Sequence, residues 1–331
     1  MEFITLIIGF ILLIKAADFF VDASVNIAKA FNVSEIVIGA TIVSIGTTLP
    51  ETLVSAVSAY KGHGDISYGN ALGSIICNTA LIAATSFVFS PSQINKKSAK
   101  QPIIFFFISF VVYSLFAYTC GGFNRIHGIV LVSIFIIYIF CTIYTEKKID
   151  KMDENTKTNK NVVNDEIKTD VNVIKEFLTL IVAAVVIAFA ANLLVDSATT
   201  IARNFNVPES VIGITIVAFG TSLPEFTTVI TSIIKKHSNI SYGNIIGANL
   251  FNLITVSGVA ILINPFSLPK TNTINGINSS LVVDIPLAFI VMLIFSIPPL
   301  ISGRTKRWQG IILMLIYVAF LIYQINLSKM A

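Results

Sequence analysis

The chain carries two copies of one unusual motif at a fixed distance from each other. Residues 39–51 read GATIVSIGTTLPE and residues 213–225 read GITIVAFGTSLPE, so nine of thirteen positions are identical at an offset of 174. The same offset aligns ISYGNALGSIICN at 66–78 with ISYGNIIGANLFN at 240–252. Agreement at one offset without a gap indicates an internal duplication, so we expect two related halves.

Long apolar segments surround these motifs and determine the fold class. Of the 331 residues, 55% are hydrophobic and 12% are charged, whereas soluble domains carry about 25% charged residues. A helix needs about 20 apolar residues to cross a bilayer. We therefore predict an all-α polytopic membrane protein, embedded in the lipid bilayer. Its ten predicted transmembrane helices are 3–28, 34–59, 66–89, 101–119, 126–145, 174–202, 208–234, 241–264, 281–301 and 308–327.

One extended polar segment, 146–173, divides the chain. It is charged and lacks aromatic residues, so we predict a flexible cytoplasmic linker. Residues 1–145 then form a first five-helix repeat and residues 174–331 a second. Because five is an odd number, the second repeat enters the membrane from the opposite side. Inverted repeats are common in secondary transporters, whose binding site lies near the membrane midplane between the repeats.

The distribution of positive charge predicts the orientation. If the N-terminus is outside, sixteen Lys and Arg residues lie in the inner connections and five in the outer ones, in agreement with the positive-inside rule. We therefore predict a multi-pass protein of the plasma membrane with both termini extracellular. The net charge of +4 is small, and we expect no nucleic-acid partner. The sequence leaves the oligomeric state open, and a monomer is sufficient for the predicted site.

The second predicted span places a proline beside a carboxylate. Pro50 has no N–H to donate to the carbonyl group of Gly46, so we expect the helix to break there and leave carbonyl oxygens free. In lipid, a free carbonyl group is tolerated only where it lines a cavity or meets a partner. Glu51 follows directly, and Pro224 with Glu225 repeats the arrangement in the second half.

Oxygen-bearing side chains recur at helical spacing around these carboxylates. Residues four apart share a helix face. Such pairs are Thr47 and Glu51, Thr221 and Glu225, Ser74 and Asn78, and Ala248 and Asn252. Two buried acids at equivalent depths repel each other, and a divalent cation between them neutralises both. Ca²⁺ accepts about six to eight oxygen ligands in a flexible geometry, so we predict a Ca²⁺ site between the halves.

The doubled motifs resemble the repeats of the sodium/calcium exchangers in the cation/calcium antiporter superfamily, of the prokaryotic type without regulatory domains. The resemblance covers the ten-span plan and is carried by GTTLPE with GNALGSIICN and by GTSLPE with GNIIGANLFN. It implies a secondary active antiporter that exchanges Na⁺ for Ca²⁺ by alternating access and electrogenically. The first and sixth spans would slide over the other eight. We expect no cofactor; Ca²⁺ and Na⁺ would be the transported ions.

The resemblance also implies roles for individual residues. The side chains of Glu51 and Glu225 would hold Ca²⁺ together with backbone carbonyl groups, those of Thr47 and Thr221. Na⁺ would compete through the same glutamates. Its further ligands would be the backbone oxygens of Ser44 and Ala218, the hydroxyl groups of Thr47 and Thr221, and Ser74. The complete predicted metal site is Glu51, Glu225, Thr47, Thr221, Ser44, Ala218, Ser74, Asn78, Asn252, Thr48, Ser222 and Ala248.

Two positions depart from the family pattern. Ala248 stands where many relatives have serine, so one hydroxyl group for Na⁺ is missing. Asn252 stands where relatives often have aspartate, so the site has two acids instead of three. The missing hydroxyl group leaves the affinity for Na⁺ and the stoichiometry open.

Two other transport functions fit parts of the same sequence pattern. A Ca²⁺/H⁺ antiporter fits Ala248 and a pair of glutamates able to carry protons. A cation channel would also use an acidic, oxygen-lined site, but inverted repeats with broken helices favour alternating access. We do not expect an enzyme, because the sequence has no nucleophile–base pair, phosphate loop or metalloprotease motif. Asp18, Asp22 and Asp196 lie toward span ends and are predicted to be entrance or interface residues.

Overall fold

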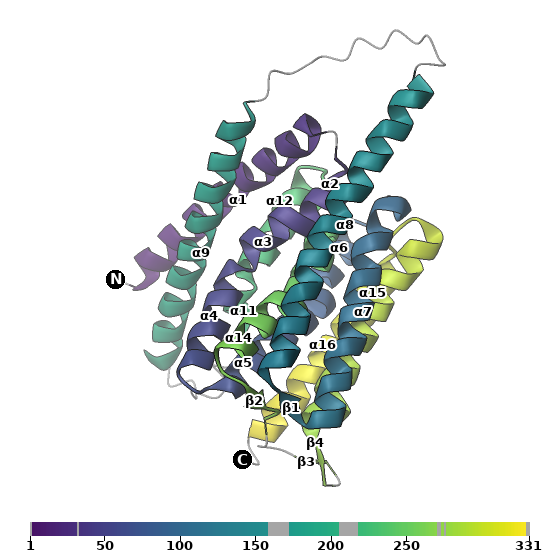
Figure 1. The fold of residues 1–331 in the computed structure, drawn as a ribbon. Coiled ribbons are helices and arrows are strands. Elements are labelled where there is room, and N and C mark those ends of the chain that lie inside the picture. Colours follow the sequence, from purple (N-terminus) through teal and green to yellow (C-terminus); the bar gives the residue numbers. More distant parts are fainter. Residues whose placement is uncertain are drawn as a thin grey trace.

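The computed structural model describes residues 2–31, 33–157, 172–204, 218–269, 273–274 and 276–328. It is almost entirely helical, with π-helical segments labelled η and two short sheets (Figure 1). The elements of the first half are α1 (Glu2–Ala30), α2 (Glu35–Ile38), η1 (Gly39–Val43), α3 (Ser44–Thr47), α4 (Leu49–Tyr60), α5 (Gly64–Cys77), η2 (Asn78–Ala83), α6 (Ala84–Phe89), α7 (Lys96–Cys120), β1 (Gly122–Phe123) and α8 (Arg125–Lys157). Those of the second half are α9 (Val173–Asn204), α11 (Ala218–Thr221), α12 (Leu223–Ile234), α13 (Ser238–Phe251), η4 (Asn252–Val256), α14 (Ser257–Ile263), β2 (Phe266–Ser267), β3 (Thr273–Ile274), β4 (Ile277–Asn278), η5 (Ser280–Asp284), α15 (Ile285–Ser302) and α16 (Arg307–Ser328).

The helices have the length and apolar character of membrane spans. Within the described residues, eight are long and apolar enough to cross a membrane, and the bent pair Glu35–Thr47 with Leu49–Tyr60 makes nine. The remaining predicted span, 208–234, the seventh along the chain, falls partly on residues 205–217, which lie outside the described part; its apolar helix Leu223–Ile234 is shorter. The membrane class of the fold is therefore confirmed, and the count of ten stays a prediction.

The predicted linker differs from the structure at its start. α8 continues through Lys157, so residues 146–157 are helical instead of irregular. These twelve residues contain neither glycine nor proline and are rich in Lys and Glu, which favour helix. No residue among them ends the helix, so it continues beyond the predicted span. The rest of the predicted linker, 158–171, lies outside the described residues.

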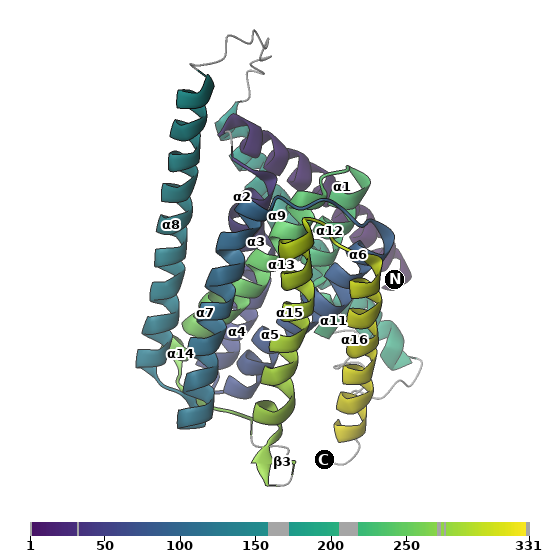
Figure 2. The ribbon, with the colours of Figure 1, turned by 90° about the vertical axis from the view of Figure 1, so that its right-hand side faces the viewer.

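α1 and α9 form a layer of their own. They pack along each other at one side of the bundle (Figure 1), and they supply most of a hydrophobic cluster that also includes Ile38, Val43 and Ile240 of the neighbouring helices. Small residues allow a close approach of two membrane helices; a Cβ atom on Gly9 of α1 would lie 3.0 Å from the Leu194 side chain of α9. Figure 2 shows α1 inclined to α7, α15 and α16.

The second span is broken where the sequence predicts. α3 ends at Thr47 and α4 begins at Leu49, with a bend of 45° between the two helical parts. Pro50 lies in the first turn of α4, where its missing N–H costs least. Thr48, between the helices, has φ −89° and ψ 3°, and Ser222 between α11 and α12 has φ −91° and ψ 7°. The two breaks therefore share one backbone geometry.

Short strands connect the halves at one end of the bundle. β1 pairs antiparallel with β2, so that Gly122 lies opposite Ser267 and Phe123 opposite Phe266. This end carries the C-terminus and is opposite to the end where α8 extends out of the bundle (Figure 1). A second pair, β3 with β4, lies close to the same end.

Candidate cation site

Two carboxylates are completely buried at the broken helices. Glu51 lies in the first turn of α4 and Glu225 in the first turn of α12, and the exposed fraction of each is 0%. None of their four oxygens has a hydrogen-bond partner among the described residues. The two groups interact electrostatically with each other. Each also lies at the positive end of a helix dipole, which favours the charged carboxylate, whereas complete burial disfavours the charge unless a cation is bound.

Two asparagines repeat this pattern on the facing helices. Asn78 and Asn252 are both fully buried, and within the described part of the chain no polar atom of either side chain has a partner. Each residue begins a π-helical segment, η2 and η4 respectively. Single π-helical turns inside α-helices occur frequently at functional sites. The two asparagines are related by the offset of 174, so both halves contribute the same feature.

The donor set of these four side chains fits a hard cation. Buried polar atoms in proteins are almost always hydrogen-bonded, because leaving them without partners costs about 1–3 kcal/mol each. Here eight such atoms from four residues have no partner in the described structure. Six of the eight are oxygens, four of carboxylates and two of amides, which is close to the number that Ca²⁺ binds. A cation would satisfy these oxygens and neutralise the two carboxylates.

The threonines of the first motif lie beside the carboxylates. Thr48 donates a hydrogen bond from Oγ1 to the carbonyl oxygen of Ser44 over 2.7 Å. Thr47 Oγ1 lies 3.4 Å from the same carbonyl oxygen. Ser222, the counterpart of Thr48, is fully buried, and its hydroxyl group has no partner among the described residues. In the first half, the Ser44 carbonyl oxygen accepts hydrogen bonds from both the backbone N–H and the hydroxyl group of Thr48.

The other predicted residues lie on the surrounding helices. Ser74 on α5 and Ala248 on α13 are buried. Thr221 ends α11 and is half-buried, and Ala218 begins it, with a side chain outside the described part. α11 packs against α5, and α13 packs against η1 and α3. Broken helices of one half thus face the third helix of the other half. The predicted residues are on adjoining helices, but their assignment as ligands stays a prediction.

Sequence reasoning missed a residue in the same region, Asn244. It is fully buried on α13, and its side-chain amide oxygen accepts a hydrogen bond from Thr47 Oγ1 over 3.2 Å. Its counterpart Asn70 donates from Nδ2 to the carbonyl oxygen of Glu51 over 3.1 Å. The available signal was an asparagine at the same place in both copies of an apolar segment.

A charged cluster joins α1 to the C-terminal end of α12. Lys235 Nζ lies 2.7 Å from a carboxylate oxygen of Asp22 and 3.6 Å from one of Asp18, and donates to the Asp18 carbonyl oxygen over 2.8 Å. Nearby, His237 Nδ1 lies 2.6 Å from Glu35 Oε1. Both aspartates are partly exposed and contact a lysine at the end of another helix; their assignment as interface or entrance residues stays a prediction.

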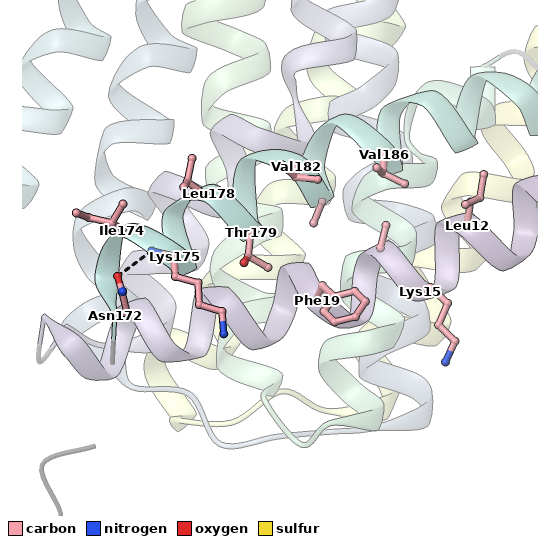
Figure 3. Close-up of a pocket in the computed structure, with 12 residues that line it drawn as sticks. Leu12, Lys15, Phe19, Asn172, Ile174, Lys175, Leu178, Thr179, Val182 and Val186 are labelled. Atoms are coloured by element: carbon pink, nitrogen blue, oxygen red, sulfur yellow. Dashed lines mark hydrogen bonds between the residues drawn. The ribbon is translucent and has the colours of Figure 1, made fainter. Parts of the chain in front are cut away.

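A cavity of about 700 Å³ lies between α1 and α9, away from this site (Figure 3). Apolar side chains such as Leu12, Phe19 and Val182 line it, and Lys15 and Lys175 stand at its edge. Among the described residues, its lining contains no carboxylate. A surface groove of this composition between two membrane helices suits lipid chains and not a cation.

Comparison with known proteins gives consistent matches over nearly the whole chain. A family model described as sodium/calcium exchanger protein matches residues 1–144 and 175–326. An uncharacterized membrane protein of Methanocaldococcus jannaschii is 34% identical over 314 residues, covering 94% of both chains. Sodium/calcium exchanger MaX1 of Methanosarcina acetivorans is 29% identical over 349 residues, covering 97% of both. A solved structure of the sodium-calcium exchanger NCX_Mj, soaked with Na⁺ and Sr²⁺, has a TM-score of 0.77 at 30% identity and covers 97% of both chains.

Proposed function

Because this chain belongs to the sodium/calcium exchanger family, we propose that it exchanges Na⁺ for Ca²⁺ by alternating access at the site of Glu51 and Glu225. As a family member it is a multi-pass membrane protein and an antiporter of these two ions. One observation carries the proposed site: four fully buried side chains from both halves have polar atoms without partners among the described residues. Oxygens from both halves at one place suit a cation bound between them.

Ca²⁺ is held by the two carboxylates and the neutral oxygens around them. Glu51 and Glu225 supply the charge, and the amide oxygens of Asn78 and Asn252 have no competing hydrogen bond among the described residues. The carbonyl oxygens of Thr47 and Thr221 complete the set. A site with two negative charges is neutral when it holds one Ca²⁺.

Na⁺ competes for the same two carboxylates. The ligands proposed beside the two glutamates are the backbone oxygens of Ser44 and Ala218, the hydroxyl groups of Thr47, Thr48, Thr221 and Ser222, and Ser74. Two Na⁺ ions neutralise the carboxylates, so a third makes the loaded site positive. Exchange of three or more Na⁺ for one Ca²⁺ then moves net charge and is electrogenic.

Alternating access follows from the two inverted repeats, 1–145 and 174–331. α1 and α9 pack mainly on each other and supply most of one hydrophobic cluster, so they can slide as a unit over the other helices. Lys235 ties α1 to α12 at one end. The counterparts of Lys235 and Asp22 at the offset of 174 are Lys61 and Asp196. We expect these two to form the matching ion pair at the other end in the opposite state.

The proposed placement in the cell follows from the charge distribution. Both termini face the outside of the plasma membrane, and the segment between the repeats lies in the cytoplasm. A Ca²⁺/H⁺ antiporter is the second candidate, favoured by one observation: Ala248 provides no hydroxyl group on α13 for Na⁺.

Transport by purified protein in vesicles separates these functions. Vesicles loaded with Na⁺ are diluted into Na⁺-free buffer with radioactive Ca²⁺, and the same is done with an outward H⁺ gradient. We expect Ca²⁺ to accumulate above its external concentration only with the Na⁺ gradient. A K⁺ diffusion potential that makes the lumen positive should raise this accumulation if each cycle moves more positive charge out as Na⁺ than in as Ca²⁺. Accumulation driven only by H⁺ supports the second candidate. Equilibration without accumulation indicates a channel. Glu51→Gln vesicles provide the inactive control.

A further inference from the structure

We infer that the side-chain hydroxyl group of Ser44 is a further Na⁺ ligand, in place of the hydroxyl group that Ala248 lacks. The inference rests on the proposed function, because it names a ligand within the same ion site. From the sequence, only the backbone oxygen of Ser44 was expected to take part. A role for the Ser44 side chain follows from where serine and alanine lie at the contacts between the two halves.

The two halves carry serine and alanine at corresponding positions. Residues 44 and 74 of the first half are both serine. Their counterparts at the offset of 174, residues 218 and 248, are both alanine. Compared half with half, the second half therefore lacks both hydroxyl groups. The packing of the helices, however, pairs α3 of the first half with α13 of the second, and α11 of the second half with α5 of the first.

Ser44 lies at the contact between α3 and α13. Its hydroxyl oxygen occupies the space beside Gly247, and a Cβ atom on Gly247 would collide with it. The same Cβ atom would be 2.6 Å from the Cα atom of Ala40, so α13 packs directly on the backbone of this segment. Gly247 immediately precedes Ala248, which is fully buried. The Ser44 hydroxyl group therefore lies beside the turn of α13 that carries the alanine.

The other contact has the reverse arrangement. α11, which begins at Ala218, packs against α5, which carries Ser74. Each contact between a broken helix and the facing helix of the other half thus combines one serine with one alanine. In one contact the hydroxyl group comes from the broken helix, at Ser44. In the other it comes from the facing helix, at Ser74. Neither contact is without a serine hydroxyl group.

The Ser44 hydroxyl group can bind a cation and keep its hydrogen bond. Its oxygen lies 2.6 Å from the carbonyl oxygen of Gly39 and 3.0 Å from that of Asn244. A hydroxyl group donates one hydrogen and has two lone pairs. Donation to a carbonyl oxygen leaves the lone pairs in place and polarises the hydroxyl oxygen toward more negative charge. Such an oxygen is a neutral, hard ligand suited to Na⁺.

Ser257 shows what a purely structural serine looks like in this fold. Its hydroxyl group donates to the carbonyl oxygen of Asn252, five residues earlier, over 3.1 Å; Ser44 donates in the same way to Gly39, over 2.6 Å. Both serines directly follow a π-helical segment, and both are buried. Ser257 lies on α14 and not at the contact between α3 and α13. The variant Ser257→Ala is therefore the matched control for loss of this hydrogen bond.

Four proteins in vesicles test the inference: wild type, Ser44→Ala, Ser257→Ala, and Ser44→Ala combined with Ala248→Ser. Exchange of radioactive Ca²⁺ for unlabelled Ca²⁺ is measured without Na⁺, and then its inhibition by rising Na⁺. We expect Ser44→Ala to raise the half-inhibiting Na⁺ concentration about tenfold and to change the half-saturating Ca²⁺ concentration much less. Ser257→Ala should move the two concentrations by a common factor, and Ala248→Ser should restore the Na⁺ response in the Ser44→Ala background.

The outcomes separate this inference from the proposed function. Equal Na⁺ inhibition of wild type and Ser44→Ala overturns the role of the hydroxyl group, as does a shift of Na⁺ and Ca²⁺ concentrations by the same factor. Failure of Ala248→Ser to restore the response in folded protein, shown by its Ca²⁺–Ca²⁺ exchange, also overturns it. Absence of Na⁺ inhibition already in the wild type contradicts the proposed function itself.

Discussion

The hydroxyl group of Thr47 on α3 donates a hydrogen bond to the side-chain amide oxygen of Asn244 on α13, over 3.2 Å. The two residues are 197 positions apart and belong to different halves of the chain. The backbone carbonyl oxygen of Asn244 also lies 3.0 Å from the hydroxyl oxygen of Ser44. One buried asparagine therefore orients two residues of the proposed site from the opposite half.

Replacement of Asn244 should impair transport through Thr47. In Asn244→Ala the Thr47 hydroxyl group loses the shorter of its two acceptor contacts and keeps only the Ser44 carbonyl oxygen at 3.4 Å, so it can rotate away from its present direction. A lost hydrogen bond of this kind costs about 0.5–1.5 kcal/mol, which corresponds to a loss of about threefold to tenfold in apparent ion affinity. The measurement is the dependence of vesicle uptake on Ca²⁺ and on Na⁺ concentration.

Asn264→Ala is the control for this prediction. Asn264 Nδ2 donates to the carbonyl oxygen of Ala59 over 3.1 Å, which is also a bond between the two halves, but it is not near the proposed ligands. If Asn264→Ala and Asn244→Ala lower the ion affinities equally, the effect comes from helix packing and not from the orientation of Thr47.

The buried carboxylates should make the ion-free protein less stable than a neutral variant. In Glu225→Gln, a buried carboxyl group without a hydrogen-bond partner among the described residues becomes an amide that stays neutral. This removes both the cost of burying a charge and the repulsion between this charge and Glu51. We expect a higher midpoint of thermal unfolding with a chelator present, together with loss of Ca²⁺ transport by about a hundredfold or more. Ca²⁺ at a hundred times its Kd should stabilise the wild type by about 2.7 kcal/mol and Glu225→Gln far less.

Glu35→Gln is the matched control for the two stability changes expected of Glu225→Gln. It is partly exposed and paired with His237 at 2.6 Å, so Glu35→Gln should not raise the unfolding midpoint in chelator and should keep the full stabilisation by Ca²⁺. A Glu225→Gln protein that is stabilised by Ca²⁺ as strongly as the wild type would remove Glu225 from the site.

The ion pair of Lys235 should hold α1 in its observed position. Lys235 Nζ lies 2.7 Å from Asp22, and a partly exposed pair contributes up to about 1 kcal/mol, or about fivefold in an equilibrium. We expect Lys235→Gln to increase backbone hydrogen exchange in α1 around Asp18 and Asp22. Lys236→Gln is the control, because that neighbouring lysine has no ion-pair partner in the described structure. Equal exchange in the two variants contradicts a holding role for Lys235.

Local rules predicted the broken helix but not the contacts between distant segments. The break at Pro50 follows from a missing N–H, and the burial of Glu51 follows from its place in an apolar span; both depend on residues close in sequence. The hydrogen bond from Thr47 to Asn244 depends on how the two halves pack together. The offset of 174 relates equivalent positions of the halves, but it does not say which positions touch. The helical continuation of α8 was missed for another reason, because charge alone does not end a helix without glycine or proline.

The connection after α12 contains a residue with a strained backbone, Lys236, whose counterpart in the first half is a glycine. Lys236 has φ 65°, and its counterpart at the offset of 174 is Gly62, with φ 84°. The left-handed region costs a residue with a side chain about 1 kcal/mol, and glycine adopts it freely. We therefore expect Lys236→Gly to raise the midpoint of thermal unfolding by about 2 °C in detergent. Lys236→Ala keeps the Cβ atom and should give no such gain; an equal rise in both variants would show that the lysine charge, and not the backbone, limits stability there.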